Sequence, residues 1–442
     1  MSFKYIDLFA GIGGFHAALH AMGGECVRAV EIDEHAARVY QKNWKMPALG
    51  DINDFVSDTD VNIPEHDVLV AGFPCQPFSK SGAQRGMEET RGTLYWSILR
   101  IIKARRPSLV ILENVRNLAG PRHAHEWEVI ISTLRDEGYC VSSKPGVFSP
   151  HLLPRSNGGR PQIRERVFIV AVRDDLELIG SGVDELPVVA NLPVDGWDPQ
   201  NWRLKSGLPL LKGKEVRAFA LTESETRWID AWDDFVVQML DLRNGERLPG
   251  FPIWADAWVR PQDLVIPNGT PKWKENFLVK NSNFYEAHRK VLEKWKKKWS
   301  IDSDLFPPSR RKLEWQAQGT PSLWETVMHL RPSGIRAKRA TYLPALVAIT
   351  QTSIIGPERR RITPLEAARL QGLPDWFDFG DQADALTYKQ LGNGVSVGAV
   401  WHVLQETIAR YEKLLKESCP GLANALLESP HTPDDLLNAM RD

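Results

Sequence analysis

The chain has 442 residues, of which 43% are hydrophobic and 25% are charged, and its formal net charge is −1 at neutral pH. This length and composition indicate a soluble globular protein with room for two domains, and the balanced charge excludes a uniformly basic nucleic-acid binder. No secretion signal opens the chain, and no run of about 18 apolar residues occurs, so we expect no membrane partner. The four cysteines lack CxxC spacing, which favours free thiols in a reducing, cytoplasmic compartment.

Residues 1–174 alternate short apolar runs with longer amphipathic stretches. The apolar runs are typical of buried parallel strands, and they lie at 4–10, 26–33, 66–73, 108–115 and 166–172. The amphipathic stretches are typical of crossover helices, and they lie at 15–23, 34–44 and 94–106. This alternation predicts a doubly wound α/β domain.

A segment rich in proline, glycine and tryptophan follows residue 174. Eleven of the sixteen tryptophans fall between Trp197 and Trp324. Tryptophan serves both in cores and as a rigid anchor in binding surfaces, and the sequence leaves both interpretations open. Residues 272–313 carry twelve Lys or Arg against five Asp or Glu, a pattern typical of a solvated helix face.

Helical periodicity returns near the C-terminal end. Thr363 is a candidate N-cap, with Pro364 at the first helical position and Glu366 at the third. A long helix is predicted over 397–417, and residues 418–442 have the character of a peripheral tail.

A glycine-rich turn with Gly11, Gly13 and Gly14 follows the first predicted strand and allows close approach of a ligand to a helix N-terminus. Glu31 ends the second strand, close to where an acidic side chain binds a ribose in dinucleotide folds. The pattern departs from GxGxxG, and no basic residue is placed for a pyrophosphate. A nucleoside without phosphates, such as S-adenosylmethionine, fits both facts. Asp51 could accept from an adenine amino group, although a lone loop aspartate is more often a turn residue.

Cys75 lies just past the apolar run at 66–73, between Pro74 and Pro77. Ligands bind at this edge in open α/β sheets, and the two prolines would aim the sulfur. A structural cysteine would normally lie within the run, so a nucleophile is a serious interpretation. No second Cys or His stands at ligand spacing, so we expect no metal.

Glu113 ends the next strand at the same edge, where its carboxyl could be protonated or bond a ring nitrogen while Asn114 braces it. Arg164 and Arg166 lie two apart and therefore on one face of an extended segment, together with Gln162. Two guanidiniums in such a site would favour a thiolate and bind a carbonyl oxygen.

These motifs occur in order from residue 4 to about 410 and resemble those of the DNA cytosine-C5 methyltransferases. "DLFAGIGGF", "EID" and "GDI" are similar to the family's cofactor-binding turns, "GFPCQPFS" to its nucleophile loop and "RGTLYW" to the helix that follows. "ENV" resembles its catalytic glutamate motif, "QIRER" its paired arginines, and "RRITPLEAARLQGLP" and "YKQLGNGVSV" its two C-terminal motifs. Many members have Ser directly after the last motif's Asn, where this chain has Gly394.

The resemblance implies a Rossmann-like S-adenosylmethionine-binding domain over 1–174, a smaller, irregular target-recognition domain over 175–385, and a returning helix and tail over 386–442. It implies cofactor contacts by Phe9, Gly11, Gly13, Gly14, Glu31, Ile32, Asp51, Ile52, Pro74, Leu94 and Asn393. It assigns the chemistry to Cys75, Glu113, Arg164 and Arg166. The basic, glycine-containing loop at 79–93 would close over a polyanion, with DNA contacts from Ser79, Ser81, Gln84 and Arg85.

The implied reaction is methyl transfer to C5 of a cytosine flipped out of a specific double-stranded DNA sequence, through a Cys75–C6 adduct. We expect a monomeric, nucleoid-associated modification enzyme that protects host DNA beside a cognate restriction endonuclease. The nearest alternative is an RNA cytosine methyltransferase of related fold. Cysteine-dependent acyl transfer would need a histidine base, and the closest, His66, precedes the strand at its far end. A non-enzymatic DNA-binding regulator would not need the catalytic set.

Overall fold

The structure, a computed structural model, describes residues 2–57, 59–74, 94–346 and 352–440. Its larger lobe is built on a seven-stranded sheet with the order β2-β1-β3-β4-β8-β5, in which β6 also pairs with β8. The strands are β1 (Lys4–Leu8), β2 (Glu25–Val30), β3 (Val68–Gly72), β4 (Leu109–Val115), β5 (Tyr139–Val141), β6 (Gly146–Phe148) and β8 (Arg166–Arg173). The strand order reverses between β1 and β3, and ligands of such sheets bind at the carboxyl ends of the strands beside this point.

Strand β8 runs in the direction opposite to the one predicted. β1, β2, β3 and β4 are parallel, as expected, whereas β8 pairs antiparallel with β4, β5 and β6. The prediction of a parallel strand over 166–172 is therefore wrong. A fully buried strand is apolar along its length in either direction, so its composition does not encode its orientation. β5 and β6 pair in succession along β8, so the chain must turn back before β8 begins.

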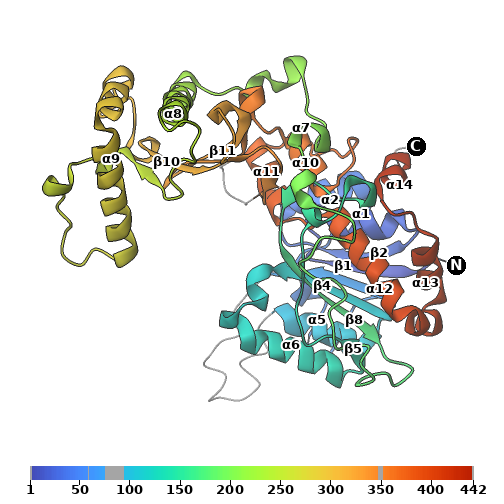
Figure 1. Cartoon of the computed structure of the whole chain (residues 1–442). Coiled ribbons are helices and arrows are strands. Elements are labelled where there is room, and N and C mark those ends of the chain that lie inside the picture. Colours follow the sequence, from blue (N-terminus) through green and yellow to red (C-terminus); the bar gives the residue numbers. More distant parts are fainter. Residues whose placement is uncertain (1, 58, 75–93, 347–351, 441–442) are drawn as a thin grey trace.

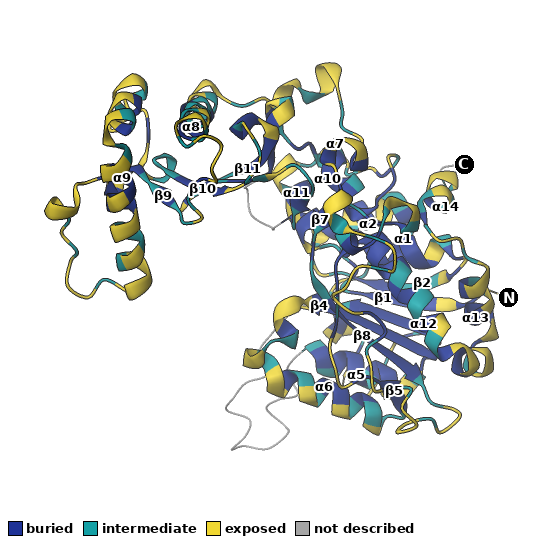
Figure 2. Cartoon of the chain, in the orientation of Figure 1, coloured by how far each residue is buried: buried dark blue, intermediate teal, exposed yellow. Residues whose placement is uncertain are grey.

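Helices cover both faces of this sheet (Figure 1), and Figure 2 shows the strands buried between them. Buried side chains on one face come from α1 (Gly14–Ala21), α2 (Glu34–Trp44) and α12 (Val397–Ser418), and on the other from α5 (Leu94–Arg105) and α6 (Ala124–Asp136). Val70 of β3 belongs to the first of these two hydrophobic clusters and its neighbour Leu69 to the second, because successive side chains of a strand point to opposite faces. The predicted doubly wound α/β class is confirmed. Within the described ranges, no helix is both long and apolar enough to cross a membrane.

The smaller lobe contains a second sheet, so it is less irregular than expected. Its six strands have the order β15-β14-β11-β12-β10-β9. They are β9 (Ile253–Trp254), β10 (Lys312–Gln316), β11 (Thr326–Arg331), β12 (Gly334–Arg339), β14 (Ile354–Ile355) and β15 (Arg360–Arg361). One face of this sheet packs with α8 (Glu223–Leu242) and α9 (Lys272–Trp299) in a third hydrophobic cluster. Between the lobes, β13 (Leu343–Pro344) pairs with β7 (Gln162–Ile163), and α7 (Leu204–Gly207) buries Leu204 in the larger lobe's core.

Most tryptophans between 197 and 324 are buried, and five of them lie in the third cluster. Six of the eleven between 197 and 324 are buried: Trp202, Trp232, Trp258, Trp295, Trp315 and Trp324. Trp273 is the clear exception, with 61% of its surface exposed. The core interpretation therefore holds for the majority, and an anchor in a binding surface is not needed to explain them.

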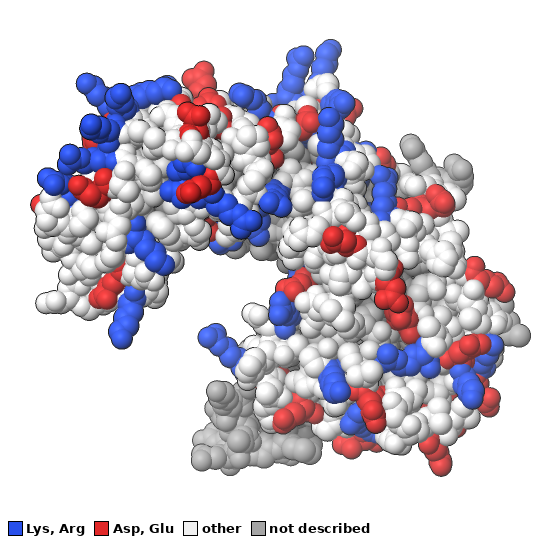
Figure 3. All heavy atoms as spheres, viewed as in Figure 1, with Lys and Arg blue, Asp and Glu red and all other residues white. Residues whose placement is uncertain are grey.

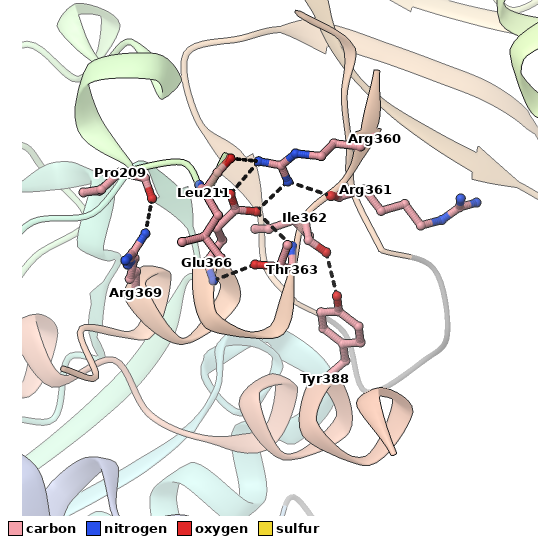
Figure 4. A network of polar contacts seen from close by, with 9 residues as sticks. All are labelled: Pro209, Leu211, Arg360, Arg361, Ile362, Thr363, Glu366, Arg369 and Tyr388. Carbon is pink, nitrogen blue, oxygen red and sulfur yellow. Dashed lines mark hydrogen bonds and ion pairs between the residues drawn. The ribbon is translucent and has the colours of Figure 1, made fainter. Parts of the chain in front are cut away.

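A buried ion pair joins the smaller lobe to α10 (Pro364–Gln371), as Figure 4 shows. Nη2 of Arg360 lies 2.7 Å from Oε1 of Glu366, and the side chains are 4% and 0% exposed. The carboxylate also accepts from the main-chain nitrogens of Leu211 and Thr363 at 2.8 and 2.9 Å. Thr363 Oγ1 accepts from the nitrogen of Glu366 in return, which completes the predicted capping box. Burial alone would raise the pKa of Glu366, but these hydrogen bonds lower it, so the carboxylate stays charged.

Replacing Glu366 by alanine is expected to lower the free energy of unfolding by about 3–5 kcal/mol, because Arg360 would keep a buried charge without its partner. Since the pKa of Glu366 is lowered in the folded state, this contribution is present at neutral pH and lost as the pH falls through that pKa. Urea unfolding measures the loss. The matched control is Asp378→Asn, which removes an exposed 2.8 Å ion pair with Lys42 and should change stability little. Equal losses of stability in both variants would contradict the interpretation that the buried ion pair of Arg360 and Glu366 stabilises the fold.

The C-terminal segment packs on the larger lobe, so the prediction of a peripheral tail is wrong. α13 (Pro420–Glu428) and α14 (Asp434–Ala439) bury side chains in the first cluster, among them Leu422, Leu426 and Leu437. Oδ1 of Asp434 lies 2.7 Å from Nη2 of Arg160. The i, i+4 spacing of Leu422 and Leu426 was the signal of an amphipathic helix.

Candidate active site

A cavity of about 440 Å³ opens at the carboxyl ends of β1, β2, β3 and β4. Its volume lies in the range of small-molecule sites. Its wall combines the glycine-rich turn after β1 with the end of α11 (Asp384–Asn393), so two segments far apart in the sequence meet here. The cavity collects ten of the eleven expected cofactor contacts: Phe9, Gly11, Gly14, Glu31, Ile32, Asp51, Ile52, Pro74, Leu94 and Asn393.

The glycine-rich turn is shaped for close approach. Gly13, the expected contact that does not line the cavity, has a φ of +91°, and a Cβ there would lie 2.1 Å from Nε1 of Trp44. A Cβ at Gly14 would lie 2.6 Å from the carbonyl oxygen of Val395. Phe9 has a φ of 57°, a left-handed conformation that is costly for this residue and that persists mainly at functional sites. Gly13 therefore serves packing, whereas Phe9 and Gly14 shape the cavity wall.

Glu31 and Asp51 are two of the acidic residues that line the cavity. The Glu31 carboxylate accepts from the main-chain nitrogens of Gly11 and Asp33, each at 2.7 Å, so its orientation is fixed. Burial raises the pKa of Glu31. Oδ1 of Asp51 accepts from the nitrogen of Asn53 at 2.9 Å, which is a turn role, yet Asp51 also lines the cavity. Asp51 therefore has a turn role and also faces the cavity, and its contact with an adenine stays a prediction.

The cavity's charges fit a nucleoside without phosphates. Arg166 and Lys389 are the cations among the described lining residues, and each faces a carboxylate: Nε of Arg166 lies 3.0 Å from Oε1 of Glu113, and Nζ of Lys389 lies 3.3 Å from Oδ2 of Asp33. Neither is therefore free for a pyrophosphate. Ile32 is 68% exposed beside the cavity and offers an apolar surface to a flat base. The residues present thus fit S-adenosylmethionine, whose sulfonium is positively charged.

Glu113 is placed to act as an acid. It lies near the carboxyl end of β4, opposite Gly72 of β3, lines the cavity and is 6% exposed. Burial raises the pKa of this carboxyl, although Arg166 and Arg164 oppose the shift. The protonated form therefore persists to higher pH than in an exposed glutamate. Arg166, 16% exposed at its side chain, faces both Glu113 and the cavity.

Asn114 does not brace Glu113 as expected. Its Nδ2 donates to the carbonyl oxygen of Phe73 at 2.9 Å, and its Oδ1 accepts from the nitrogen of Val115 at 2.8 Å. Asn114 therefore ties the end of β4 to the residue before Pro74. A side chain at the next position along a strand points to the other face, which is why Asn114 and Glu113 diverge.

Arg164 lies behind the cavity wall rather than in it. Its side chain is 1% exposed, and Nη2 donates to the carbonyl oxygens of Gly392 and Gly394 at 2.8 and 2.5 Å. These two residues flank Asn393. Burial lowers the pKa of Arg164 to about 9, so it remains charged at neutral pH. The geometry differs from the expectation that Arg164 reaches the base beside Arg166, because its Nη2 already donates to two main-chain carbonyl oxygens.

Replacing Arg164 by methionine is expected to raise the KM for S-adenosylmethionine by about ten- to hundredfold, because charged hydrogen bonds hold the segment around Asn393. Arg164→Lys keeps the charge and should lose less. Initial rates over a range of cofactor concentrations, with circular dichroism as a control for folding, measure the change. A fall in kcat at unchanged KM would instead favour a direct role of Arg164 in the chemistry.

Cys75, Ser79, Ser81, Gln84 and Arg85 lie outside the described residues, so their roles stay predictions. Pro74, the residue before Cys75, lines the cavity. The other three thiols are poor candidates for a nucleophile, because burial raises the pKa values of Cys26 and Cys140 to about 12 and that of Cys419 to about 11.

The histidine nearest to Cys75 in the sequence, His66, does not line this cavity. Among the lining residues that the structure describes there is no histidine. His66 precedes β3 at its amino end, and its Nδ1 lies 2.8 Å from the carbonyl oxygen of Pro64. No group of three His, Cys, Asp or Glu side chains in the described part of the chain could hold a metal ion.

Sequence reasoning missed several wall residues, namely Phe15, Val115, Lys389, Gln390 and Val395. Val115 ends the "ENV" motif, and Lys389, Gln390 and Val395 lie in "YKQLGNGVSV". The motifs were therefore identified from the sequence, but these side chains were not predicted to line the cavity. The signal for Val115 is an apolar residue past the end of a buried strand, where it is 41% exposed.

The fold and this cavity define a class, an α/β enzyme that binds a nucleoside at the carboxyl edge of its sheet. Residues 3–409 match the family model of the C-5 cytosine-specific DNA methylases. The chain is 48% identical to the type II methyltransferase M.AluI of Cellulosimicrobium cellulans, over 99% of this chain and 98% of that protein. It is 30% identical to the type II methyltransferase M.BanI of Aneurinibacillus aneurinilyticus, over 92% and 96%. The chain therefore belongs to the C-5 cytosine-specific DNA methylase family, which uses S-adenosylmethionine as methyl donor.

One solved structure with a similar course is a putative DNA modification methyltransferase encoded within a prophage of E. coli. It is 21% identical, has a TM-score of 0.46, and the match covers 93% of this chain and 99% of that one.

Proposed function

We propose that this chain is the modification enzyme of a type II restriction-modification system, which methylates C5 of a flipped-out cytosine in a specific double-stranded DNA sequence. The observation that carries the proposal is the cavity, which brings Glu113 and Arg166 together with ten expected contacts for S-adenosylmethionine. Membership of the family and the similarity to type II methyltransferases support the DNA substrate and a cognate endonuclease. A monomer in the cytoplasm, associated with the nucleoid, is part of the same proposal.

The chemistry assigned to the residues follows from what cytosine lacks. Its C5 is too weakly nucleophilic to take a methyl group directly, so the Cys75 thiolate adds to C6 while Glu113 gives a proton to N3, which makes C5 enamine-like. S-adenosylmethionine supplies the methyl group from its sulfonium. Loss of the C5 proton to water or hydroxide, return of the N3 proton to the Glu113 carboxylate and expulsion of the Cys75 thiolate would then restore the ring.

Arg166 would hold the base carbonyl and, as a cation, favour the ionised form of Cys75. Because these atoms are out of reach in a stacked duplex, the base must leave the helix. The 79–93 loop, with Ser79, Ser81, Gln84 and Arg85, is proposed to close over the DNA. Arg164 is proposed to act by holding the main chain on both sides of Asn393.

The division into a catalytic domain (1–174 and 386–442) and a recognition domain (175–385) is also a proposal. The separate third cluster, whose residues run from Ile229 to Ile354, supports an independent core in the middle of the chain. Buried residues from Ile362 onward pack in the first cluster with the larger lobe. This packing favours a return to the catalytic domain before residue 385.

Incubation with tritiated S-adenosylmethionine and separate DNA and RNA substrates tests the proposal. We expect label in double-stranded DNA alone, and bisulfite sequencing of that DNA should map 5-methylcytosine to one recurring sequence. Label only in RNA would favour the RNA methyltransferase alternative, and label on adenine would overturn the reaction itself.

A further inference from the structure

The end of α11 forms part of the cavity wall and is attached to the protein from behind. Nη2 of Arg164, a residue that is 1% exposed, donates to the carbonyl oxygens of Gly392 and Gly394. Lys389, one turn earlier on α11, also lines the cavity, but its side chain is 48% exposed. Lys389 therefore lies at the solvent-exposed rim of the cavity, whereas Arg164 holds α11 from the buried side.

An ion pair at this rim joins α11 to the turn after β2. Nζ of Lys389 lies 3.3 Å from Oδ2 of Asp33, which also lines the cavity and precedes Lys389 by 356 residues. In the described part of the chain, no other hydrogen bond or ion pair links α11 with residues 31–36. The pair therefore bridges two lining segments that lie far apart in the sequence.

Asp33 is prepared for this contact by its neighbours. Its Oδ1 accepts from the main-chain nitrogens of His35 and Ala36 at 3.0 and 3.1 Å, which caps the N-terminus of α2 and fixes the side chain. Burial alone would raise the pKa of Asp33, but the hydrogen bonds from Ala36 and Lys389 lower it, so the carboxylate stays charged at neutral pH. Since the cap already orders one partner, forming the ion pair costs less side-chain entropy than it would between two mobile side chains.

The same turn carries the polar contacts that shape the nucleoside site. The main-chain nitrogen of Asp33 donates to Oε1 of Glu31, and Oε2 of Glu31 accepts from the nitrogen of Gly11, each at 2.7 Å. Contacts thus run from Lys389 through Asp33 and Glu31 to the glycine-rich turn. Ile32, the exposed apolar residue beside the cavity, lies between the two acidic residues in the sequence. A shift of Asp33 would therefore disturb the contacts expected for both the ribose and the base.

Exposed ion pairs carry little weight in general. Figure 3 shows acidic and basic side chains close together at several places on the larger lobe. Such pairs typically contribute little to stability. Lys42 and Asp378 form an exposed pair at 2.8 Å, and neither is among the described residues that line the cavity. The pair of Lys389 and Asp33 differs because both of its members line the cavity, so its contribution falls on the site that holds the nucleoside.

We propose that Lys389 is a positioning residue for the cofactor: its ion pair with Asp33 holds the end of α11 against the turn after β2, and this contact retains S-adenosylmethionine in the cavity. The inference rests on the proposed function, because it takes the cavity as the S-adenosylmethionine site. Lys389 acts through Asp33 and need not touch the cofactor. S-adenosylhomocysteine, the product, keeps the adenosine but lacks the methyl group and the positive charge of the sulfonium. The ion pair should therefore retain the product and the cofactor to the same extent.

The variants Lys389→Met, Lys389→Arg and Asp33→Asn, made in the full chain, test the pair. Asparagine is also a good N-cap, so Asp33→Asn keeps the contacts of Oδ1 with α2 and removes the charge that faces Lys389. At low salt, Lys389→Met and Asp33→Asn should each bind S-adenosylmethionine about two- to fivefold more weakly in calorimetric titration, the range typical of an exposed ion pair. The double variant should bind no more weakly than either single variant, and Lys389→Arg should retain most of the affinity.

Two further measurements separate this role from a general loss of structure. The rate at which S-adenosylmethionine dissociates, measured by stopped-flow displacement, should rise by the same factor as the affinity falls. In about 0.5 M salt the difference from the unaltered protein should shrink, because salt screens exposed charges. The matched control is Lys42→Met, which removes an exposed pair of similar accessibility and should bind as the unaltered protein does.

Unchanged affinity in both Lys389→Met and Asp33→Asn would overturn the inference, and so would losses that add in the double variant. A loss for S-adenosylmethionine but not for S-adenosylhomocysteine would also overturn it, because the lysine would then act on the charge of the sulfonium rather than on the rim. Failure of the unaltered protein to bind S-adenosylmethionine would count against the proposed function itself. Normal binding by the unaltered protein together with unaffected variants would count against the role of Lys389 alone.

Discussion

Cys75→Ala is expected to abolish methyl transfer to DNA while S-adenosylmethionine binding stays largely intact. Without the sulfur no adduct forms at C6, so C5 never becomes nucleophilic. The cofactor cavity is built by residues on either side of this position, including Pro74, and its acids and main-chain donors do not depend on the thiol. Tritium transfer measures the first effect, and calorimetric titration with S-adenosylmethionine measures the second.

The matched control is Cys140→Ala. Cys140 is fully buried in β5, and burial raises its pKa to about 12, so it offers no thiolate at neutral pH. Its replacement should leave the rate per folded molecule unchanged. Full activity in Cys75→Ala would refute the mechanism, whereas equal losses in both variants would show that the assay reports folding.

Local signals in the sequence predicted several features of this molecule well. The capping box at Thr363, the helices beside the glycine-rich turn and the carboxyl-edge position of Glu113 depend on neighbours within a few residues, and each occurs as expected. The direction of β8 could not be predicted from such local signals, because it is decided by how the short strands β5 and β6 pair along it. Arg164 was misplaced for a similar reason, since its partners are more than 200 residues away in the sequence.

The second sheet illustrates the same limit. Its strands are two to six residues long, and β9 pairs with β10 across a helix of 28 residues. Such non-local pairing leaves little trace in a sequence dense in proline and tryptophan. The basic side chains of β11 and β12 fall at alternate positions, but only the pairing of these strands shows that Arg331, Arg336 and Lys338 share one face. Residues that share a face in this part of the chain can therefore be identified only from the structure.

Glu113→Gln is expected to lower kcat by about 10²–10⁴-fold, the usual contribution of a positioned general acid, because an amide can hydrogen-bond N3 but cannot give it a proton. Its shape is close to that of the carboxyl, so the cavity and cofactor binding should persist. The pH dependence distinguishes this role from a packing role. Burial raises the pKa of Glu113, so its neutral form is present at low pH and is lost as the pH rises through that value.

Activity that depends on the protonated carboxyl should therefore decline on the alkaline side in the unaltered protein, and Glu113→Gln should lack this decline while it remains slow throughout. The rate of tritium transfer at saturating cofactor and DNA, measured over a range of pH, reports both effects. The free energy of unfolding should also fall as the pH rises through the pKa of Glu113. Ionisation then places a charge in a site that is 6% exposed, and Arg166 at 3.0 Å compensates for it only in part. A glutamine variant with the full rate, or with an unaltered alkaline decline, would show that proton transfer to the base comes from another group.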